Sequence, residues 1–145
     1  MKTRWIIFWL GLILAISAGL SLISIHLPFG RDQGVSAYFG WQILQGKVPY
    51  RDLYHFNFPG IFYTYAIAFK LFGLKPEAIN LFDLLFRLFT LVGIYLASSC
   101  LFGKKAGLWS GGIYGIISTV VYNNYWQNAQ KETFALGALA YCLYF

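Results

Sequence analysis

The fold is decided by an apolar run near the start of the chain, Trp5 to Gly30, which reads WIIFWLGLILAISAGLSLISIHLPFG and holds no Lys, Arg, Asp or Glu. A helix that crosses the hydrocarbon core of a bilayer needs about 20 apolar residues. A secretory signal peptide is the alternative, but its apolar region is only about 7 to 15 residues long. Trp5 to Leu27 exceeds that length, so we interpret it as an uncleaved membrane anchor, preceded by Lys2 and Arg4.

The composition of the whole chain agrees with a membrane protein. Of its 145 residues, 59% are hydrophobic, 21% aromatic and 11% charged, whereas a soluble domain has about 25% charged residues. The net charge of +6 does not indicate nucleic-acid binding, because Lys and Arg occur in ones and twos and form no basic patch. Cys100 and Cys142 lie far apart without a zinc or redox spacing, and we expect both to be small buried hydrophobic residues.

Further apolar stretches predict more membrane helices. Helices are expected at about residues 5–27, 78–102, 106–125 and 130–145. We therefore predict an all-α integral membrane protein with about four transmembrane helices and a long loop at 28–77. The length allows one domain. Because no cap or polar tail follows the apolar residues 136–145, we expect 1–145 to be the N-terminal part of a single polytopic domain.

The segment Gly60 to Gly73, GIFYTYAIAFKLFG, is apolar but short. At 1.5 Å per residue it reaches about 21 Å, less than the roughly 30 Å hydrocarbon core. If it lies along the interface, the pair Lys104-Lys105 shares the cytoplasmic side with the N-terminal basic residues, as the positive-inside rule requires. We therefore predict short interfacial helices in the first loop, with residues 28–77 and the polar patch Asn123 to Glu132 on the outer face.

The first candidate for chemistry is Asp32, which directly follows the first apolar run. Asp is a preferred N-cap, and Gln33 to Gln45 resembles a short helix that Asp32 would start. A carboxylate held at the edge of the hydrocarbon is also costly and tends to mark a functional site. The residues alone leave both interpretations open.

The second candidate region is the loop Gly46 to Gly60, GKVPYRDLYHFNFPG, which Gly and Pro punctuate. It interleaves aromatic residues with Arg51, Asp52 and His55, a mixture that suits a phosphorylated lipid head group and a sugar. The Arg and Asp neighbours are alternatively a surface ion pair worth under about 1 kcal/mol. A single His is more often structural than a ligand.

Asp83 and Arg87 lie four residues apart in the predicted helix 78–102, so they share a helix face and can pair. One interpretation is an intrahelical ion pair that reaches toward the interface. The other is that Arg87 faces a cavity, where its guanidinium binds phosphate.

Lys131 and Glu132 end the polar patch before the last apolar run. Glu132 is either a helix-start acid favoured by the helix dipole or a substrate-binding group. Lys131 is either an interfacial anchor or a partner in the same site.

These residues together form a pattern that resembles the GT-C superfamily of membrane glycosyltransferases, most of all bacterial relatives of the protein O-mannosyltransferases and the lipid A aminoarabinose transferase. The matching positions are Asp32, Gly46, Pro49, Tyr50, Asp52, Pro59, Gly60, Lys70-Leu71-Phe72-Gly73 and Arg87. The resemblance covers nearly the whole chain and implies an integral protein of the bacterial plasma membrane. The positive-inside rule predicts that its N-terminus is cytoplasmic.

The resemblance also implies an activity. Such enzymes transfer a sugar from a polyprenyl-phosphate donor to an acceptor hydroxyl on a lipid, glycan or protein at the outer face of the membrane, usually with inversion. Asp32 matches the general base of the family, and Glu132 matches an acidic position that binds substrate or orients an ion. A divalent metal is a candidate cofactor, with His55 and Glu132 as candidate ligands.

One segment departs from the family pattern. Close relatives often carry Lys-Pro-Pro or Glu-Lys-Pro where this chain has His55-Phe56-Asn57-Phe58-Pro59. A lysine near the donor phosphate and a possible metal-binding carboxylate are thereby missing, and His55 is the candidate to replace them.

The rival hypothesis is a non-enzymatic membrane protein, either a transporter fragment or a scaffold subunit. Transporters usually bind substrate near the midplane of the membrane, between inverted repeats. This chain shows no repeat, and its polar residues gather at one predicted interface. The pattern therefore favours chemistry at the interface.

Overall fold

This computed structural model describes residues 3–119 and 129–145, and its regular secondary structure over these residues is entirely α-helical. The helices are α1 (Thr3–Leu22), α2 (Arg31–Leu44), α3 (Gly60–Phe72), α4 (Pro76–Phe102), α5 (Lys104–Ile117) and α6 (Lys131–Tyr144). The predicted all-α class is confirmed over these residues. The short helix expected at 60–73 is present as α3.

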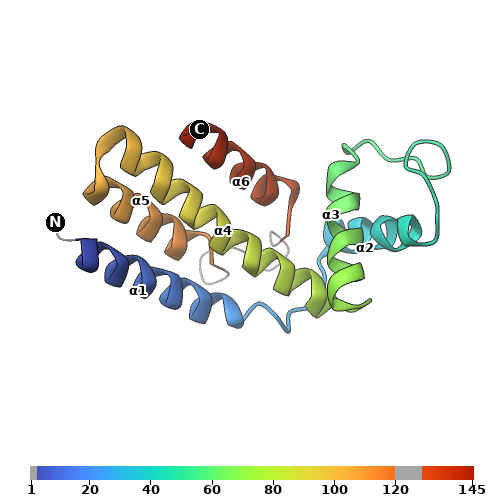
Figure 1. Cartoon of the computed structure of the whole chain (residues 1–145). Helices are drawn as coiled ribbons and strands as arrows, with labels where there is room; N and C mark the ends of the chain where they lie inside the picture. Colours follow the sequence, from blue (N-terminus) through green and yellow to red (C-terminus); the bar gives the residue numbers. More distant parts are fainter. Residues whose placement is uncertain (1–2, 120–128) are drawn as a thin grey trace.

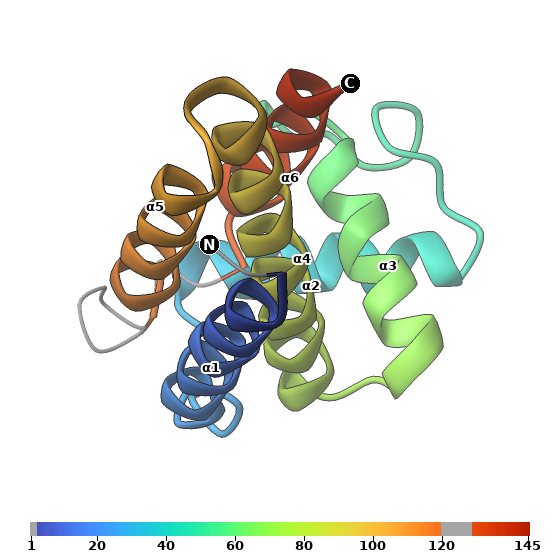
Figure 2. The same ribbon diagram turned by 60° about the vertical axis from the view of Figure 1, so that its left-hand side comes forward.

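Four helices form a bundle, and the other two form a smaller unit at one end of it. Helices α1, α4, α5 and α6 run side by side and alternate in direction, while α2 and α3 pack together beyond the start of α4 (Figure 1). Helix α4 is central, because it contacts α1, α3, α5 and α6 (Figure 2). The N-terminus and the turn between α4 and α5 lie at the end of the bundle opposite α2 and α3 (Figure 1).

Two of these helices are long and apolar enough to cross a membrane, Arg4–Leu22 and Pro76–Phe102. Only 17% and 33% of their most apolar windows are buried inside the protein, unlike the core helices of soluble proteins. Helices α5 and α6 have 14 residues each, or about 21 Å. The structure therefore supports two of the four predicted crossings. The helix predicted at 106–125 ends at Ile117 as α5, and the predicted residues 120–125 lie outside the described residues.

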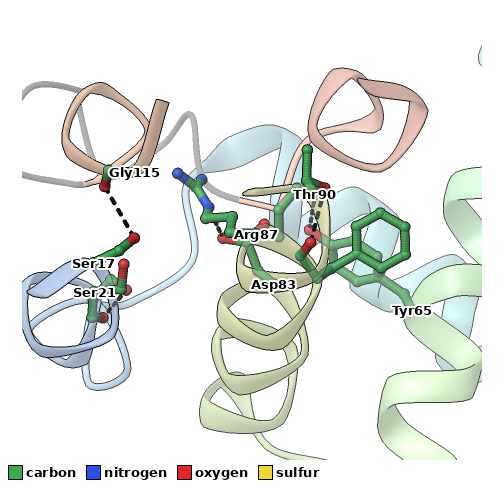
Figure 3. Close-up of polar contacts among 10 residues, drawn as sticks. Ser17, Ser21, Tyr65, Asp83, Arg87, Thr90 and Gly115 are labelled. Carbon is green, nitrogen blue, oxygen red and sulfur yellow. Dashed lines mark hydrogen bonds and ion pairs between the residues drawn. The ribbon is translucent and has the colours of Figure 1, made fainter. Parts of the chain in front are cut away.

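Close backbone approach holds the bundle together. A Cβ added at Gly107 would lie 1.9 Å from Ser99 Oγ, and one at Gly137 would lie 2.5 Å from Phe86 Cε1. Helix α1 is joined to α5 by the Ser17 hydroxyl, which donates a 3.0 Å hydrogen bond to the Gly115 carbonyl (Figure 3). Small residues and interhelical hydrogen bonds of this kind are typical of helix packing in membranes.

The largest apolar cluster lies at the α2–α3 end of the molecule. Its members come from α2, α3, the start of α4 and the turn before α6: Ala37, Phe39, Ile61, Phe62, Tyr65, Ala68, Phe69, Ala78, Ile79 and Ala129. Phe39 and Phe62 stack with ring centroids 4.5 Å apart. The cluster fixes the two short helices against the end of the bundle.

The two cysteines differ from expectation. Cys100 and Cys142 are both exposed, so the prediction that they are buried is wrong. Each lies on a face of α4 or α6 that turns away from the bundle. An apolar sequence context does not distinguish such a face from a protein core, because in a membrane helix both are apolar.

Candidate functional site

A polar cleft of about 320 Å³ lies between the start of α2, the loop before α3 and the start of α6. It is lined by Arg31, Asp32, Val35, Ser36, His55, Phe56, Asn57, Ile61, Gln130, Lys131 and Glu132. Four of the residues predicted from the sequence therefore share one cleft, although three separate segments of the chain supply them. Arg51, Asp52 and Arg87, the other three predicted site residues, do not line it.

Asp32 reaches the cleft from the first turn of α2. The N-cap of this helix is Gly30, whose N–H donates to Gln33 Oε1 at 2.6 Å. The interpretation of Asp32 as the N-cap is therefore wrong, because the helix begins at Arg31 and the side chain of Gln33 satisfies the cap. The carboxylate of Asp32 is exposed at the positive end of the helix dipole.

His55 and Asn57 form the loop side of the cleft. The backbone N–H of Asn57 donates to His55 Nδ1 at 3.1 Å, so the proton of a neutral imidazole lies on Nε2. The ring packs edge-on against Phe39 and Phe62, with centroid distances of 5.3 and 5.5 Å, and stacks on Phe56 at 4.5 Å. His55 is thus a fixed hydrogen-bond donor.

Lys131 and Glu132 form the helix side of the cleft as the first residues of α6. Lys131 Nζ lies 3.3 Å from Asn57 Oδ1, which links α6 to the loop before α3. Glu132 occupies the first turn of α6, as the helix-start interpretation predicted. Glu132 also lines the cleft and two neighbouring hollows.

The first of these hollows, of about 420 Å³, lies among α4, α5 and α6. Arg87 lines it together with Tyr114, Ser118 and Glu132. Arg87 Nε donates to Asp83 Oδ2 at 2.7 Å, and the two side chains are only 7% and 4% exposed (Figure 3). The predicted pairing is confirmed, and the pair is buried beside a hollow.

The second hollow, also of about 420 Å³, is a largely apolar groove between α3 and α6. Its lining residues are Phe58, Gly60, Ile61, Thr64, Lys131, Glu132, Phe134 and Ala135. The two charged residues lie at the polar cleft, so the groove leads from that cleft along an apolar surface.

Arg51 and Asp52 lie in the turn before the cleft and line none of the three hollows. They form an ion pair of 2.9 Å, and their side chains are 70% and 25% exposed. The Arg51 hydrogen bond, together with a 2.8 Å bond from the Val48 N–H, lowers the pKa of Asp52 to about 2. This arrangement matches the surface ion pair that the sequence left open.

The chain was then compared with known proteins. A family model described as dolichyl-phosphate-mannose-protein mannosyltransferase matches residues 57–145. The chain belongs to this family. No curated protein and no solved structure matches the chain.

Membership in the mannosyltransferase family confirms the GT-C resemblance and indicates a membrane glycosyltransferase. The matched region contains Asn57, Arg87, Lys131 and Glu132, whereas Asp32 precedes it. The family as a whole uses sugars carried on a polyprenyl phosphate, and with the two apolar helices it indicates an integral membrane protein.

The cleft also contains polar residues that the sequence analysis did not select as site residues. Asn57 and Gln130 both line the cleft. Asn57 had a signal, because the aromatic residues at 54, 56 and 58 alternate with His55 and Asn57, and alternate positions of an extended segment lie on the same side. Gln130 had none beyond its place next to Lys131.

A divalent metal fits the described part of this site poorly. Within residues 3–119 and 129–145, no group of three His, Cys, Asp or Glu side chains is placed to hold one. Metal ligation by His55 Nε2 would also require the ring proton on Nδ1, which here accepts the Asn57 N–H. We therefore derive no step of the reaction through a metal.

Proposed function

We propose that the complete protein transfers a sugar, with mannose as the first candidate, from a polyprenyl-phosphate donor to an acceptor hydroxyl with inversion. The observation that carries the proposal is the cleft that gathers Asp32, His55, Lys131 and Glu132. It combines an exposed carboxylate, a fixed imidazole donor and a cation, which are the groups that a displacement at a sugar phosphate needs.

Asp32 is the proposed general base. It takes the proton of the acceptor hydroxyl while the acceptor oxygen forms a bond to the anomeric carbon of the sugar. The bond from that carbon to the phosphate oxygen breaks, and its electron pair leaves with the polyprenyl phosphate. A single displacement from the opposite face inverts the anomeric centre. A positioned base of this kind contributes about 10²- to 10⁴-fold to a rate.

Lys131 and His55 are the proposed partners of the leaving phosphate. The ammonium of Lys131 is oriented by Asn57, and the Nε2–H of His55 is available to donate because Nδ1 is engaged. Donors held in place before the reaction stabilise charge that develops during it. Glu132 repels a phosphate, so we assign its carboxylate to hydroxyl groups of the sugar. Arg87 lines the adjoining hollow and is a second candidate phosphate ligand.

The apolar groove between α3 and α6 is the proposed path of the polyprenyl chain. It begins at Lys131 and Glu132 and continues past Ile61 and Phe134. An isoprenoid tail laid along it would place its phosphate at the polar cleft. The apolar contact would supply binding energy remote from the reacting atoms.

We place the proposed reaction at the outer face of a bacterial plasma membrane, as the family resemblance implies. Arg4 and the pair Lys104-Lys105 lie at the end of the bundle away from α2 and α3 (Figure 1). Basic residues favour the cytoplasmic side. The N-terminus is therefore assigned to the cytoplasm, and the cleft to the opposite side.

The test uses membranes that contain the full-length protein and polyprenyl-phosphate mannose, with sugar followed into lipid, glycan and protein fractions. Asp32→Asn should lower transfer at least 100-fold without changing membrane insertion. Glu77→Gln is the matched control, because Glu77 is also an exposed acid in the first turn of a helix but lines none of the three hollows. A wild-type rate for Asp32→Asn would remove the base assignment. Absence of transfer with any polyprenyl-phosphate sugar would favour the non-enzymatic alternative.

A further inference from the structure

The backbone at Ala129 is held in an unusual conformation directly before the cleft residues of α6. Ala129 has a φ of +49°, in the left-handed region that costs a residue with a side chain about 1–2 kcal/mol. It is only 1% exposed and belongs to the apolar cluster at the α2–α3 end. Because Lys131 follows two residues later, this turn sets the direction in which α6 begins.

Side chains from two other helices engage the peptide groups of Ala129. The hydroxyl of Tyr65, from α3, donates a 3.0 Å hydrogen bond to the Ala129 carbonyl. The Ala129 N–H lies beside the carboxylate of Asp83, from α4. Tyr65 is itself 1% exposed, and Figure 3 shows it reaching from α3 toward the α4 residues. Burial raises the pKa of Tyr65, which keeps the phenol protonated as a donor.

We propose that Tyr65 is a positioning residue of the transferase: its hydroxyl holds the turn at Ala129 and so directs Lys131 and Glu132 into the cleft. The inference rests on the proposed function for its consequence in catalysis. It extends that function to a side chain that lines none of the three hollows.

Backbone chemistry explains why a hydroxyl is needed at this point. A buried carbonyl that loses its partner is destabilised, and Ala129 has an intrinsic reason to leave the left-handed region. Without the Tyr65 hydroxyl, both effects favour a rearranged turn. The Lys131 ammonium, now 3.3 Å from Asn57 Oδ1, would then move relative to the loop.

The first test is Tyr65→Phe in the full-length protein. We expect a loss of about tenfold in kcat/KM, the size expected for one buried hydrogen bond. Ala129→Gly in the Tyr65→Phe background should recover most of it, because glycine adopts positive φ without penalty. Tyr141→Phe is the matched control, since the Tyr141 hydroxyl also donates to a backbone carbonyl, that of Phe89 at 3.2 Å, but away from the turn. Near wild-type kcat/KM is expected for it.

A second readout does not depend on catalysis. Cysteines at Asn57 and Lys131, with Cys100 and Cys142 replaced by Ser, report the spacing of loop and helix through a short bifunctional thiol reagent. Tyr65→Phe should slow this cross-link several-fold, and Ala129→Gly should restore it. A normal rate of cross-linking in Tyr65→Phe would overturn the inference. So would a loss of kcat/KM in Tyr141→Phe equal to that in Tyr65→Phe, combined with a failure of Ala129→Gly to rescue Tyr65→Phe. A cross-link that responds as expected in a protein without transferase activity would uphold the positioning and reject the proposed function instead.

Discussion

The contact between α2 and α3 offers a direct test of how the fold positions the cleft. Helix α2 carries Asp32, and α3 carries Tyr65. The two helices meet at Gly40, where an added Cβ would lie 2.8 Å from Tyr65 Cβ and 3.0 Å from the backbone nitrogen of Ala66. These atoms cannot rotate away, because they belong to the backbone or are attached directly to it.

The size of the perturbation follows from these distances. Ordinary contact begins at 3.4 Å, so Gly40→Ala requires the helices to separate by about 0.6 Å, with an overpacking cost of about 1–3 kcal/mol. Alanine in a helix interior is about 1 kcal/mol more favourable than glycine, and this propensity partly offsets the overpacking cost. Gly34→Ala in the same helix gains this helix propensity without any overpacking cost, because nothing lies within 4 Å of its Cβ position. The difference between the two variants therefore isolates the contact.

The assay compares the free energies of unfolding of the two full-length variants in detergent, together with their transfer rates. Gly40→Ala should be about 1–3 kcal/mol less stable than Gly34→Ala. It should also be at least tenfold slower, since a displacement of about 1 Å at reacting groups costs up to 10²-fold. Gly34→Ala should retain wild-type transfer. Equal stability and equal rates for the two variants would refute the reasoning that this contact sets the cleft.

Two further predictions concern the groove and the topology. Ala135→Trp fills the groove between α3 and α6. It should raise KM for the polyprenyl donor at least severalfold with a smaller effect on kcat, because remote binding contacts are lost. The control is Ala138→Trp, which is exposed on the same helix outside the groove, and an equal KM for both variants would contradict the assignment. The topology is tested in a chain lacking native cysteines. A cysteine at Gln45, which is exposed at the end of α2, should react in whole cells with an impermeant thiol reagent, whereas a cysteine at Lys104 should not. The reverse labelling would show that the topology is inverted.

Features set by local sequence were predictable. The Asp83–Arg87 pair follows from a spacing of four residues, which places both side chains on one helix face wherever the helix lies. The start of α6 at Lys131 likewise follows from a polar patch meeting an apolar run. The apolar segment at 60–73 forms a helix for the same local reason.

The position of Asp32 shows where local reasoning becomes ambiguous. Both Gly30 and Asp32 are acceptable N-cap residues, and the choice depends on the Gln33 side chain turning back to the Gly30 N–H. Glycine has no side chain of its own to complete a reciprocal capping pattern, so the sequence carries only half of that signal. The Asp32 carboxylate therefore has no capping role, which agrees with its proposed role as a base.

Membership of the cleft could not be predicted, because it depends on tertiary contacts. Lys131 meets Asn57 across 74 positions of sequence, and the turn at Ala129 is set by Tyr65 across 64. Arg51 and Asp52 lie closer in sequence to His55 than Lys131 does, yet they turn outward and pair with each other. Composition indicated which loop is polar, but it did not indicate which of its side chains face inward.

The charge balance of the cleft has a consequence for turnover. Its formally charged side chains are two bases, Arg31 and Lys131, and two acids, Asp32 and Glu132. A strongly basic cleft would bind the released polyprenyl phosphate at least as tightly as the donor, since the freed phosphate carries more negative charge, and product release would limit the rate. In the proposed reaction, a balanced cleft would instead stabilise the phosphate through the donors Lys131 and His55, while the two acids would oppose retention of the product. The low charge of the chain therefore suits the chemistry as well as the membrane, because interactions that strengthen only as charge develops raise kcat, whereas a general positive field would lower KM alone.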